Sequence, residues 1–213
     1  MIKFLLRKNF VDGWDNMFLI ILCNFIVIAM CIGGYFAIAS TISNIYLAVA
    51  LFFVITAVVF IPLFSVAEVC QQIACFKSIE TKDFFVNISK VWKVAVPFGL
   101  FFAFLVILAL VAFPFYAQNE SLLGMALVSL LFCIYVVIVL SLQWFVPIYV
   151  NMHGGFFKTL KKSFIFFFDN AGFSIFFFLY TIFLSIVSFI IVFLVPGFSG
   201  VILAQCNAVK LRM

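Results

Sequence analysis

The chain has 213 residues, of which 69% are hydrophobic and only 9% are charged. A soluble domain needs roughly 25% charged residues to cover its surface, and one with this composition would leave large apolar patches in water. An ordinary soluble fold is therefore excluded, and lipid is expected to cover most of the surface. The formal net charge of +5 does not predict nucleic-acid binding, because the basic residues are scattered beside apolar stretches instead of gathered on one face or tail.

The N-terminal residues 1–16 are predicted to form an amphipathic helix on the membrane surface. Apolar residues recur there at every fourth position: Ile2, Leu6, Phe10 and Trp14. Charged residues fill the other side, and the amphipathic ring of a tryptophan suits the headgroup level. A frayed, charged N-terminus is the alternative interpretation of the same residues.

The uncharged run 17–39 predicts the first transmembrane helix. It is longer than the ~7–15-residue core of a secretory signal, and two acidic residues, Asp12 and Asp15, precede it. We therefore expect a retained span, although Ala37-Ile38-Ala39 resembles a cleavage site.

Three further uncharged runs predict transmembrane helices. They cover residues 45–67, 94–117 and 122–150. Pro97 and Pro114 lie near the two ends of the run 94–117, where a lost backbone hydrogen bond costs least.

The connection 76–93 is the most polar part of the chain, and its aromatic residues give it an apolar side. An interfacial helix is predicted here. Glu68 marks the end of the preceding span, where we expect an exposed setting with Lys90 or Lys93 as its simplest partner.

Residues 151–172 begin with a basic and aromatic run and break at Asp169-Asn170-Ala171-Gly172. They predict a third interfacial helix, followed by a fifth transmembrane helix at 173–194. The apolar segment 198–209 is about 18 Å long at 1.5 Å per residue, too short to cross a ~30 Å hydrocarbon core. The chain is therefore predicted to be an all-α, polytopic membrane protein with five transmembrane helices, a short or broken sixth, and interfacial amphipathic helices before spans 1, 3 and 5.

The chain is predicted to form a single integral membrane domain, in which three helical-hairpin units can be laid over one another. These units are 1–75, 76–150 and 151–213. Phe84-Phe85 and Phe156-Phe157, for example, begin similar aromatic and basic runs. Such internal symmetry is common in membrane folds, but aromatic and basic residues collect at any bilayer interface, so both explanations stay open.

The distribution of charge predicts the orientation. Ten of the twelve Lys and Arg lie in 1–16, 76–93 and 151–172, which alternating spans put on one side. By the positive-inside rule this side, with the N-terminus, is cytoplasmic. Lys210 and Arg212 favour a cytoplasmic C-terminus and therefore a sixth crossing of the membrane. The short length of the segment 198–209 argues against that crossing. The residues expected to set topology and meet anionic headgroups are Lys3, Arg7, Lys8, Lys90, Lys93, Lys158, Lys161 and Lys162.

No feature of the sequence predicts a catalytic, cofactor-binding or metal site. The six cysteines show no metal-ligand spacing, and no HExxH, GxSxG or glycine-rich phosphate loop occurs. The one histidine, His153, has no partner near it in the sequence and is interpreted as incidental; an enzyme using it would need a polar pocket at the cytoplasmic face. No ionisable residue falls at a span centre, which argues against proton-coupled transport.

A few uncharged polar side chains lie in or near the spans: Asn24, Ser141, Gln143, Ser185 and Ser188. Hydrogen bonding between helices is the favoured interpretation. The alternative is a polar path for a small neutral solute such as a sugar.

Three segments carry a resemblance to a known family. They are Trp14-Asp15-Asn16 with the first span, Thr81-Lys82-Asp83-Phe84-Phe85 through Trp92-Lys93, and Leu142-Gln143-Trp144-Phe145-Val146-Pro147 leading to Thr159-Leu160-Lys161-Lys162-Ser163. Their order resembles the YesL-like family of small bacterial integral membrane proteins, a domain of unknown function. Members often accompany sugar-uptake and polysaccharide-utilisation genes, which implies a permease-like or accessory role.

The expected function is therefore that of a non-enzymatic accessory or scaffold protein of the bacterial inner membrane, linked to carbohydrate uptake. A permease or channel for a small neutral solute is the alternative. The expected partners are membrane lipids, and a transporter complex or a second copy of the chain. No cofactor and no nucleic acid is expected.

Overall fold

The computed structural model describes residues 2–77, 79–118, 121–190 and 197–212. Within these ranges the chain is helical and contains no strand. The helices are α1 (Ile2–Asp15), α2 (Met17–Ala39), α3 (Ile45–Ala74), α4 (Thr81–Ala117), α5 (Leu122–Leu142), α6 (Phe145–Met152), α7 (Phe156–Asp169), α8 (Ala171–Ile190) and α9 (Gly197–Arg212). Five candidate spans are long and apolar enough to cross a membrane, namely α2, α3, α4, the joined α5 and α6, and α8. The prediction of an all-α, polytopic membrane protein is confirmed.

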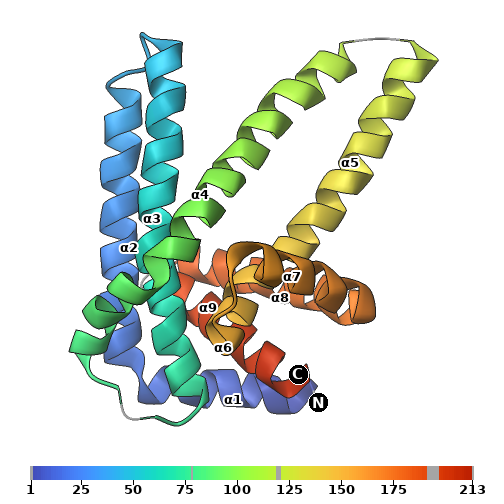
Figure 1. The fold of residues 1–213 in the computed structure, drawn as a ribbon. Coiled ribbons are helices and arrows are strands. Elements are labelled where there is room, and N and C mark those ends of the chain that lie inside the picture. The colour runs from blue at the N-terminus through green and yellow to red at the C-terminus, as the bar shows by residue number, and fades with distance from the viewer. Residues whose placement is uncertain (1, 78, 119–120, 191–196, 213) are drawn as a thin grey trace.

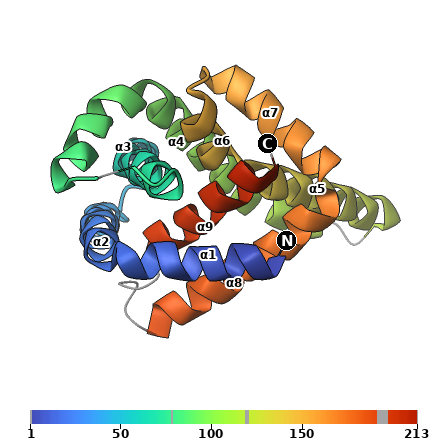
Figure 2. The same cartoon turned by 90° about the horizontal axis from the view of Figure 1, so that it is seen from below.

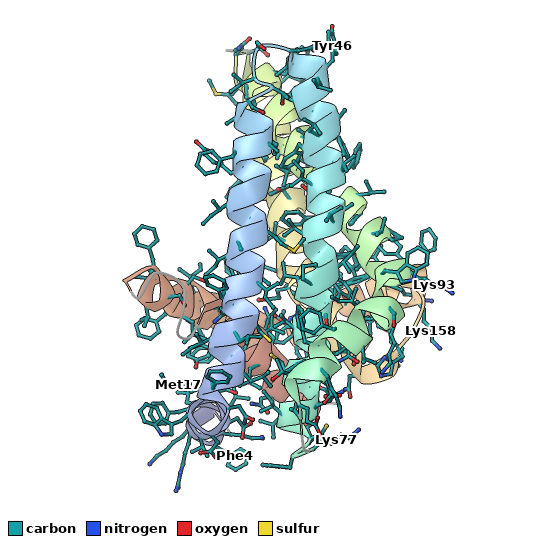
Figure 3. All side chains as sticks on the ribbon, turned by 90° about the vertical axis from the view of Figure 1, so that its left-hand side faces the viewer. Phe4, Met17, Tyr46, Lys77, Lys93 and Lys158 are labelled. Carbon is teal, nitrogen blue, oxygen red and sulfur yellow. The ribbon has the colours of Figure 1, made fainter. Side chains whose placement is uncertain are left out.

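The helices form two hairpins above a crowded base. Figure 1 shows α2 and α3 side by side as one hairpin, α4 and α5 as a second, more open one, and α1, α6, α7 and α9 gathered below them. Lys77, Lys93 and Lys158 lie at this base, far from Tyr46 near the α2–α3 turn (Figure 3). The basic connections therefore share one end of the molecule, as alternating spans require.

Helix α3 is longer than the predicted span 45–67. Asn44 caps its start by accepting a hydrogen bond from the Leu47 amide, and the helix continues past Glu68 to Ala74. It ends in a Schellman motif: Phe76 has φ of 56°, and the Lys77 and Phe76 amides donate to the carbonyls of Gln72 and Ile73 at 3.1 and 2.9 Å. Glu68 consequently lies within the helix rather than at its exit.

Helix α4 unites two elements that the sequence separated, an interfacial helix at 76–93 and a span at 94–117. The helix begins at Thr81, where Glu80 and Asp83 form a capping box, and runs without interruption to Ala117. Pro97 therefore lies in its interior rather than near its start. The helix bends between its lower and upper parts (Figures 1 and 2), as a proline that removes a backbone hydrogen bond allows.

The fourth predicted span, 122–150, is two helices rather than one. The chain turns at Gln143 and Trp144 between α5 and α6. Trp144 is fully buried and donates from Nε1 to the Ser174 hydroxyl at 2.9 Å, so the break is held by a contact with α8. A tryptophan N–H in an apolar interior needs such a partner.

Helix α7 and the break at Asn170 agree with the predicted interfacial helix and its end. Helix α8 follows, and residues 191–194 of the predicted fifth span lie outside the described ranges. Although α8 is apolar and long enough to cross a membrane, it lies at the base and runs crosswise to the direction of the α2–α3 hairpin (Figures 1 and 2).

The short helix α9 lies inside the molecule, with its C-terminal end at the base beside the start of α1 (Figure 1). Most of its side chains are buried. Several polar contacts bind it to α3. Among them, the Cys70 thiol donates to the Ser199 carbonyl at 3.4 Å, and Lys210 donates to the Ala74 carbonyl at 2.8 Å. With 16 residues it is about 24 Å long and too short to cross the hydrocarbon core alone.

The predicted three-fold repeat stays a prediction. Helices α1 and α7 are both 14 residues long, end in aspartate, and are followed by Asn16 and Asn170. The middle unit differs, because its interfacial part is fused into α4.

Gly99 sets the distance between α3 and α4, and its replacement tests this packing. A Cβ at this position would lie 2.7 Å from Ala57 Cα and 3.0 Å from Thr56 O, atoms of a backbone that cannot move aside freely. We predict that Gly99→Ala lowers the free energy of unfolding by about 1–3 kcal/mol. The measurement is unfolding of the purified protein in detergent. Gly33→Ala is the matched control, since a Cβ there has nothing within 4 Å, and it should leave stability unchanged or higher.

Candidate functional site

Two of the polar residues predicted in the spans, Asn24 and Ser188, hold the start of α9. Asn24 Oδ1 accepts a hydrogen bond from the Ser199 amide at 2.8 Å, and the Ser188 hydroxyl accepts one from the Gly197 amide at 3.0 Å. Gly197 has φ of 59°, and a Cβ there would collide with the Asn24 amide. Side chains of α2 and α8 thus satisfy N–H groups that α9 itself leaves open.

The other three predicted residues also bond to nearby backbone. The hydroxyls of Ser141 and Ser185 donate within their own helices, to Val137 and Thr181, both at 2.8 Å. Gln143 Nε2 donates to the carbonyls of Leu140 and Ser174, at 2.9 and 3.1 Å. Ser185 and Ser188 line a small cavity of about 190 Å³, whose other walls are largely apolar. The predicted set therefore does not converge on one polar path.

A different group of polar residues does converge, around a cavity of about 670 Å³ between α3, α4 and α6. It belongs to the same end of the molecule as Lys77, which Figure 3 places at the base. The residues that line it are Glu68, Gln71, Gln72 and Cys75 of α3, Lys77 after it, Asn87 and Lys90 of α4, Tyr149, Val150 and Asn151 of α6, and His153.

Glu68 and His153 face each other in this cavity. Glu68 is only 8% exposed, so the expectation of an exposed setting was wrong, because α3 continues beyond it and α4 and α6 pack nearby. Its Oε1 lies 3.3 Å from His153 Nδ1, so the histidine that lacked a partner in the sequence has one in the fold. His153 ends α6 with φ of 48°, a left-handed conformation that histidine tolerates better than most residues.

Two buried polar atoms near this pair lack hydrogen-bond partners in the described part of the chain. Lys90 donates to Asn87 Oδ1 at 3.3 Å, whereas Asn87 Nδ2 has no acceptor, although the residue is 2% exposed. Gln71 donates to Asn151 Oδ1 at 3.1 Å, whereas Gln71 Oε1 has no donor. Buried polar groups are normally paired, so a donor and an acceptor here are available to a ligand or to water.

The polar lining ends at an aromatic cluster on the inner side. One turn before Glu68, α3 carries Phe64, which is fully buried. Its ring lies 5.4 Å from Tyr149 and 5.5 Å from Phe98, and Phe98 stacks on Phe145 at 4.2 Å. The cavity therefore borders a packed apolar core, not a second polar region.

Sequence reasoning missed most of this site, although part of its signal was present. Glu68, Gln71, Gln72 and Cys75 are spaced as one face of a helix, at the end of an otherwise apolar run. The sequence also indicates that Cys70–Phe76 can continue the helix beyond the bilayer, but it does not show that α4 and α6 pack against this polar face. The contributions of Asn87, Tyr149 and Asn151 come from the packing of distant segments and have no local signal.

The residues predicted to meet headgroups divide into two groups. Lys90 lines the cavity, Lys8 pairs with Asp12 at 2.5 Å and lies over the Phe76 ring, and Lys162 contacts the Met152 sulfur. The remaining five are exposed: Lys3, Arg7, Lys93, Lys158 and Lys161.

Among the described residues, no group of three His, Cys, Asp or Glu side chains lies close enough to hold a metal ion. All six cysteines are free thiols. The cavity thus offers hydrogen bonds and charge to a ligand.

No family model matches the chain, and no curated protein or solved structure is significantly similar to it. The resemblance to the YesL-like family rests on the three sequence segments alone.

A double-mutant cycle measures the Glu68–His153 contact. His153→Ala removes the nearest side-chain partner of a buried carboxylate, and we predict a loss of about 1 kcal/mol of stability, since the imidazole is largely exposed. In a Glu68→Gln background, His153→Ala should have a much smaller effect. The coupling should be smaller at high salt than at low salt, because salt screens a partly exposed ion pair. Equal coupling at both salt concentrations would contradict an ionic contact.

Proposed function

We propose that this protein is a non-enzymatic accessory protein of a bacterial inner membrane that binds a small polar solute in the cavity around Glu68 and His153. The observation that carries the proposal is the convergence of charged and polar side chains from α3, α4 and α6 on one cavity. Within it Asn87 Nδ2 and Gln71 Oε1 are buried without a hydrogen-bond partner in the described part of the chain, whereas the polar residues of the spans do not converge.

The chemistry of the cavity supports a ligand with both donors and acceptors. Lys77 and Lys90 supply cationic donors, Glu68 supplies a carboxylate, and the amides of Gln71 and Asn87 supply one free group of each kind. A sugar or sugar phosphate has hydroxyl groups that serve as both. The volume of the cavity, about 670 Å³, falls within the ~300–1,000 Å³ typical of small-molecule sites.

Binding without passage is favoured by the aromatic cluster. A solute that moved from the cavity into the bilayer centre would have to displace Phe64 and its neighbours, whose rings are in mutual contact. A permease for a small neutral solute is the second candidate, and the polar cavity itself is the observation in its favour. Transport would require the cluster to open.

The orientation belongs to the same proposal. The N-terminus and the basic connections face the cytoplasm by the positive-inside rule, so the cavity opens toward cytoplasmic solutes. A role beside a sugar transporter agrees with the resemblance to the YesL-like family.

Ligand binding is tested by a matched pair of lysine substitutions on α4. The purified full chain in detergent is heated with glucose, maltose or glucose 6-phosphate, and the unfolding temperature is recorded. We predict that at least one of these probes raises it, that Lys90→Gln reduces the shift, and that Lys93→Gln, outside the cavity lining, leaves it unchanged. No shift with any probe would count against a sugar-like ligand.

Transport is tested separately in liposomes that contain only this protein. An accessory protein is predicted to give no uptake of the labelled probe above empty liposomes. Uptake that Glu68→Gln abolishes would establish the permease instead.

The orientation is tested by cysteine labelling of intact cells. A cysteine in place of Lys161, in a variant whose native cysteines are replaced, should resist a membrane-impermeant reagent added outside and react after the membrane is opened. Strong labelling from outside would overturn the proposed orientation.

A further inference from the structure

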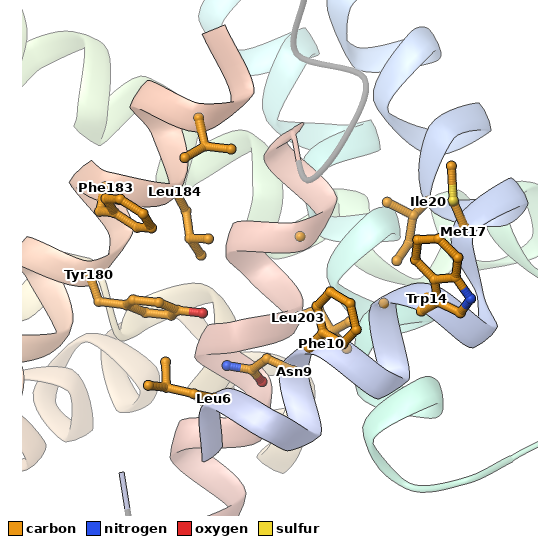
Figure 4. Close-up of a pocket in the computed structure, with 13 residues that line it drawn as sticks. Leu6, Asn9, Phe10, Trp14, Met17, Ile20, Tyr180, Phe183, Leu184 and Leu203 are labelled. Carbon is orange, nitrogen blue, oxygen red and sulfur yellow. The ribbon is translucent and has the colours of Figure 1, made fainter. Parts of the chain in front are cut away.

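A second cavity lies in the lower part of the molecule, between α1, the start of α2, α8 and α9. Its volume is about 390 Å³ and its walls are almost wholly apolar. Figure 4 shows the side chains that line it, with Leu6 and Tyr180 at one end and Trp14 and Met17 at the other. It is a groove elongated along α1, distinct from the polar cavity.

One face of α1 forms a complete wall of this groove. Leu6, Asn9, Phe10, Gly13 and Trp14 all line it, at the three- and four-residue spacing of a helical stripe. The adjoining face of α1 is buried against the protein: Leu5 is 2% exposed, and Asp12 accepts a hydrogen bond from Asn207 of α9 at 3.0 Å. The protein thus holds α1 in place while leaving its apolar stripe uncovered.

Gly13 keeps the middle of the groove open. A Cβ at this position would meet nothing within 4 Å. Glycine in a helix interior costs about 1 kcal/mol relative to alanine, and here no backbone contact requires it. Its effect is to leave room along the wall between Phe10 and Trp14.

One end of the groove is polar. Asn9 Oδ1 accepts a hydrogen bond from Asn207 at 2.8 Å, and the Asn9 side chain also interacts with the Tyr180 hydroxyl. The Tyr180 hydroxyl points toward Asn9 across the same end (Figure 4). Polar groups at this end can donate to an ester carbonyl. The apolar walls beyond them can receive a hydrocarbon chain.

Two cations lie beyond the polar end. Lys3 and Arg7 are exposed and sit within one turn of Leu6 on α1. Neither forms an ion pair within the described ranges, unlike Lys8, which pairs with Asp12. Along α1, the cations Lys3 and Arg7 are therefore followed by the polar Asn9 and then by the apolar stripe that ends at Trp14.

We propose that this groove binds one anionic glycerophospholipid, with an acyl chain along the α1 stripe, an ester carbonyl at Asn9 and Tyr180, and the phosphate at Lys3 and Arg7. The apolar end leads to Met17 and Ile20 at the start of α2, the first candidate span, so the chain enters the groove from the hydrocarbon side. The lipid covers the apolar stripe of α1 that lines the groove.

The experiment compares phosphatidylglycerol with phosphatidylcholine on the purified full chain in detergent. Native mass spectrometry counts retained lipid, and thermal unfolding measures its effect. We expect one phosphatidylglycerol to be retained per chain and to raise the unfolding temperature by about 5 °C at roughly 100 times its dissociation constant. Phosphatidylcholine should have a much smaller effect. Equal retention and stabilisation by the two lipids would indicate an annular lipid only and overturn the proposal.

Two substitutions separate the acyl-chain contact from the headgroup contact. Gly13→Leu fills the groove, should raise the unfolding temperature of the lipid-free protein, and should abolish lipid retention. Gly33→Leu, at an open glycine of α2 outside the groove, is its matched control and should retain lipid. Lys3→Gln with Arg7→Gln should make the two lipids equivalent. If the Gly13→Leu variant retains as much lipid as the wild type, the lipid binds elsewhere. If the variant with both Lys3→Gln and Arg7→Gln still prefers phosphatidylglycerol to the same degree, these two cations do not bind the phosphate.

Discussion

The capping of α9 inside the protein is the interaction on which the rest of the structure depends. A helix that begins inside an apolar interior leaves backbone N–H groups without partners, and each unsatisfied group costs several kcal/mol where water is absent. Asn24 of α2 and Ser188 of α8 supply the missing acceptors for Ser199 and Gly197. Because these acceptors come from two other helices, they fix the start of α9 between α2 and α8.

The central position of α9 explains the arrangement around it. Trp144 joins the break between α5 and α6 to Ser174 of α8, and Lys210 and Cys70 join α9 to α3. Every one of these contacts links segments far apart in the sequence. Asn24, Ser188 and Gln143 thus connect helices through their polar groups, whereas the charged and polar side chains that converge on one cavity lie at the base.

The base carries a polar cavity and an apolar groove, because α3 and α1 present different faces there. Helix α3 extends beyond the apolar run and brings a polar face, with Glu68, against α4 and His153. Helix α1 instead turns one face to the protein through Asp12 and Asn207 and leaves its apolar stripe open. A polar solute and a lipid chain would therefore meet the same end of the molecule in separate places.

The sequence by itself determined the class of the protein, the helical runs, the turn at 41–44, the break near Asn170 and the grouping of basic connections at one end. These features follow from local composition and from the length of the bilayer, which act within a single segment. The tertiary structure alone decided that α4 is continuous, that the run 122–150 breaks at Trp144, that α8 runs crosswise to the direction of the α2–α3 hairpin, and that Glu68 is buried opposite His153. Helix ends and side-chain partners of this kind depend on contacts between distant segments, which no local pattern of residues encodes.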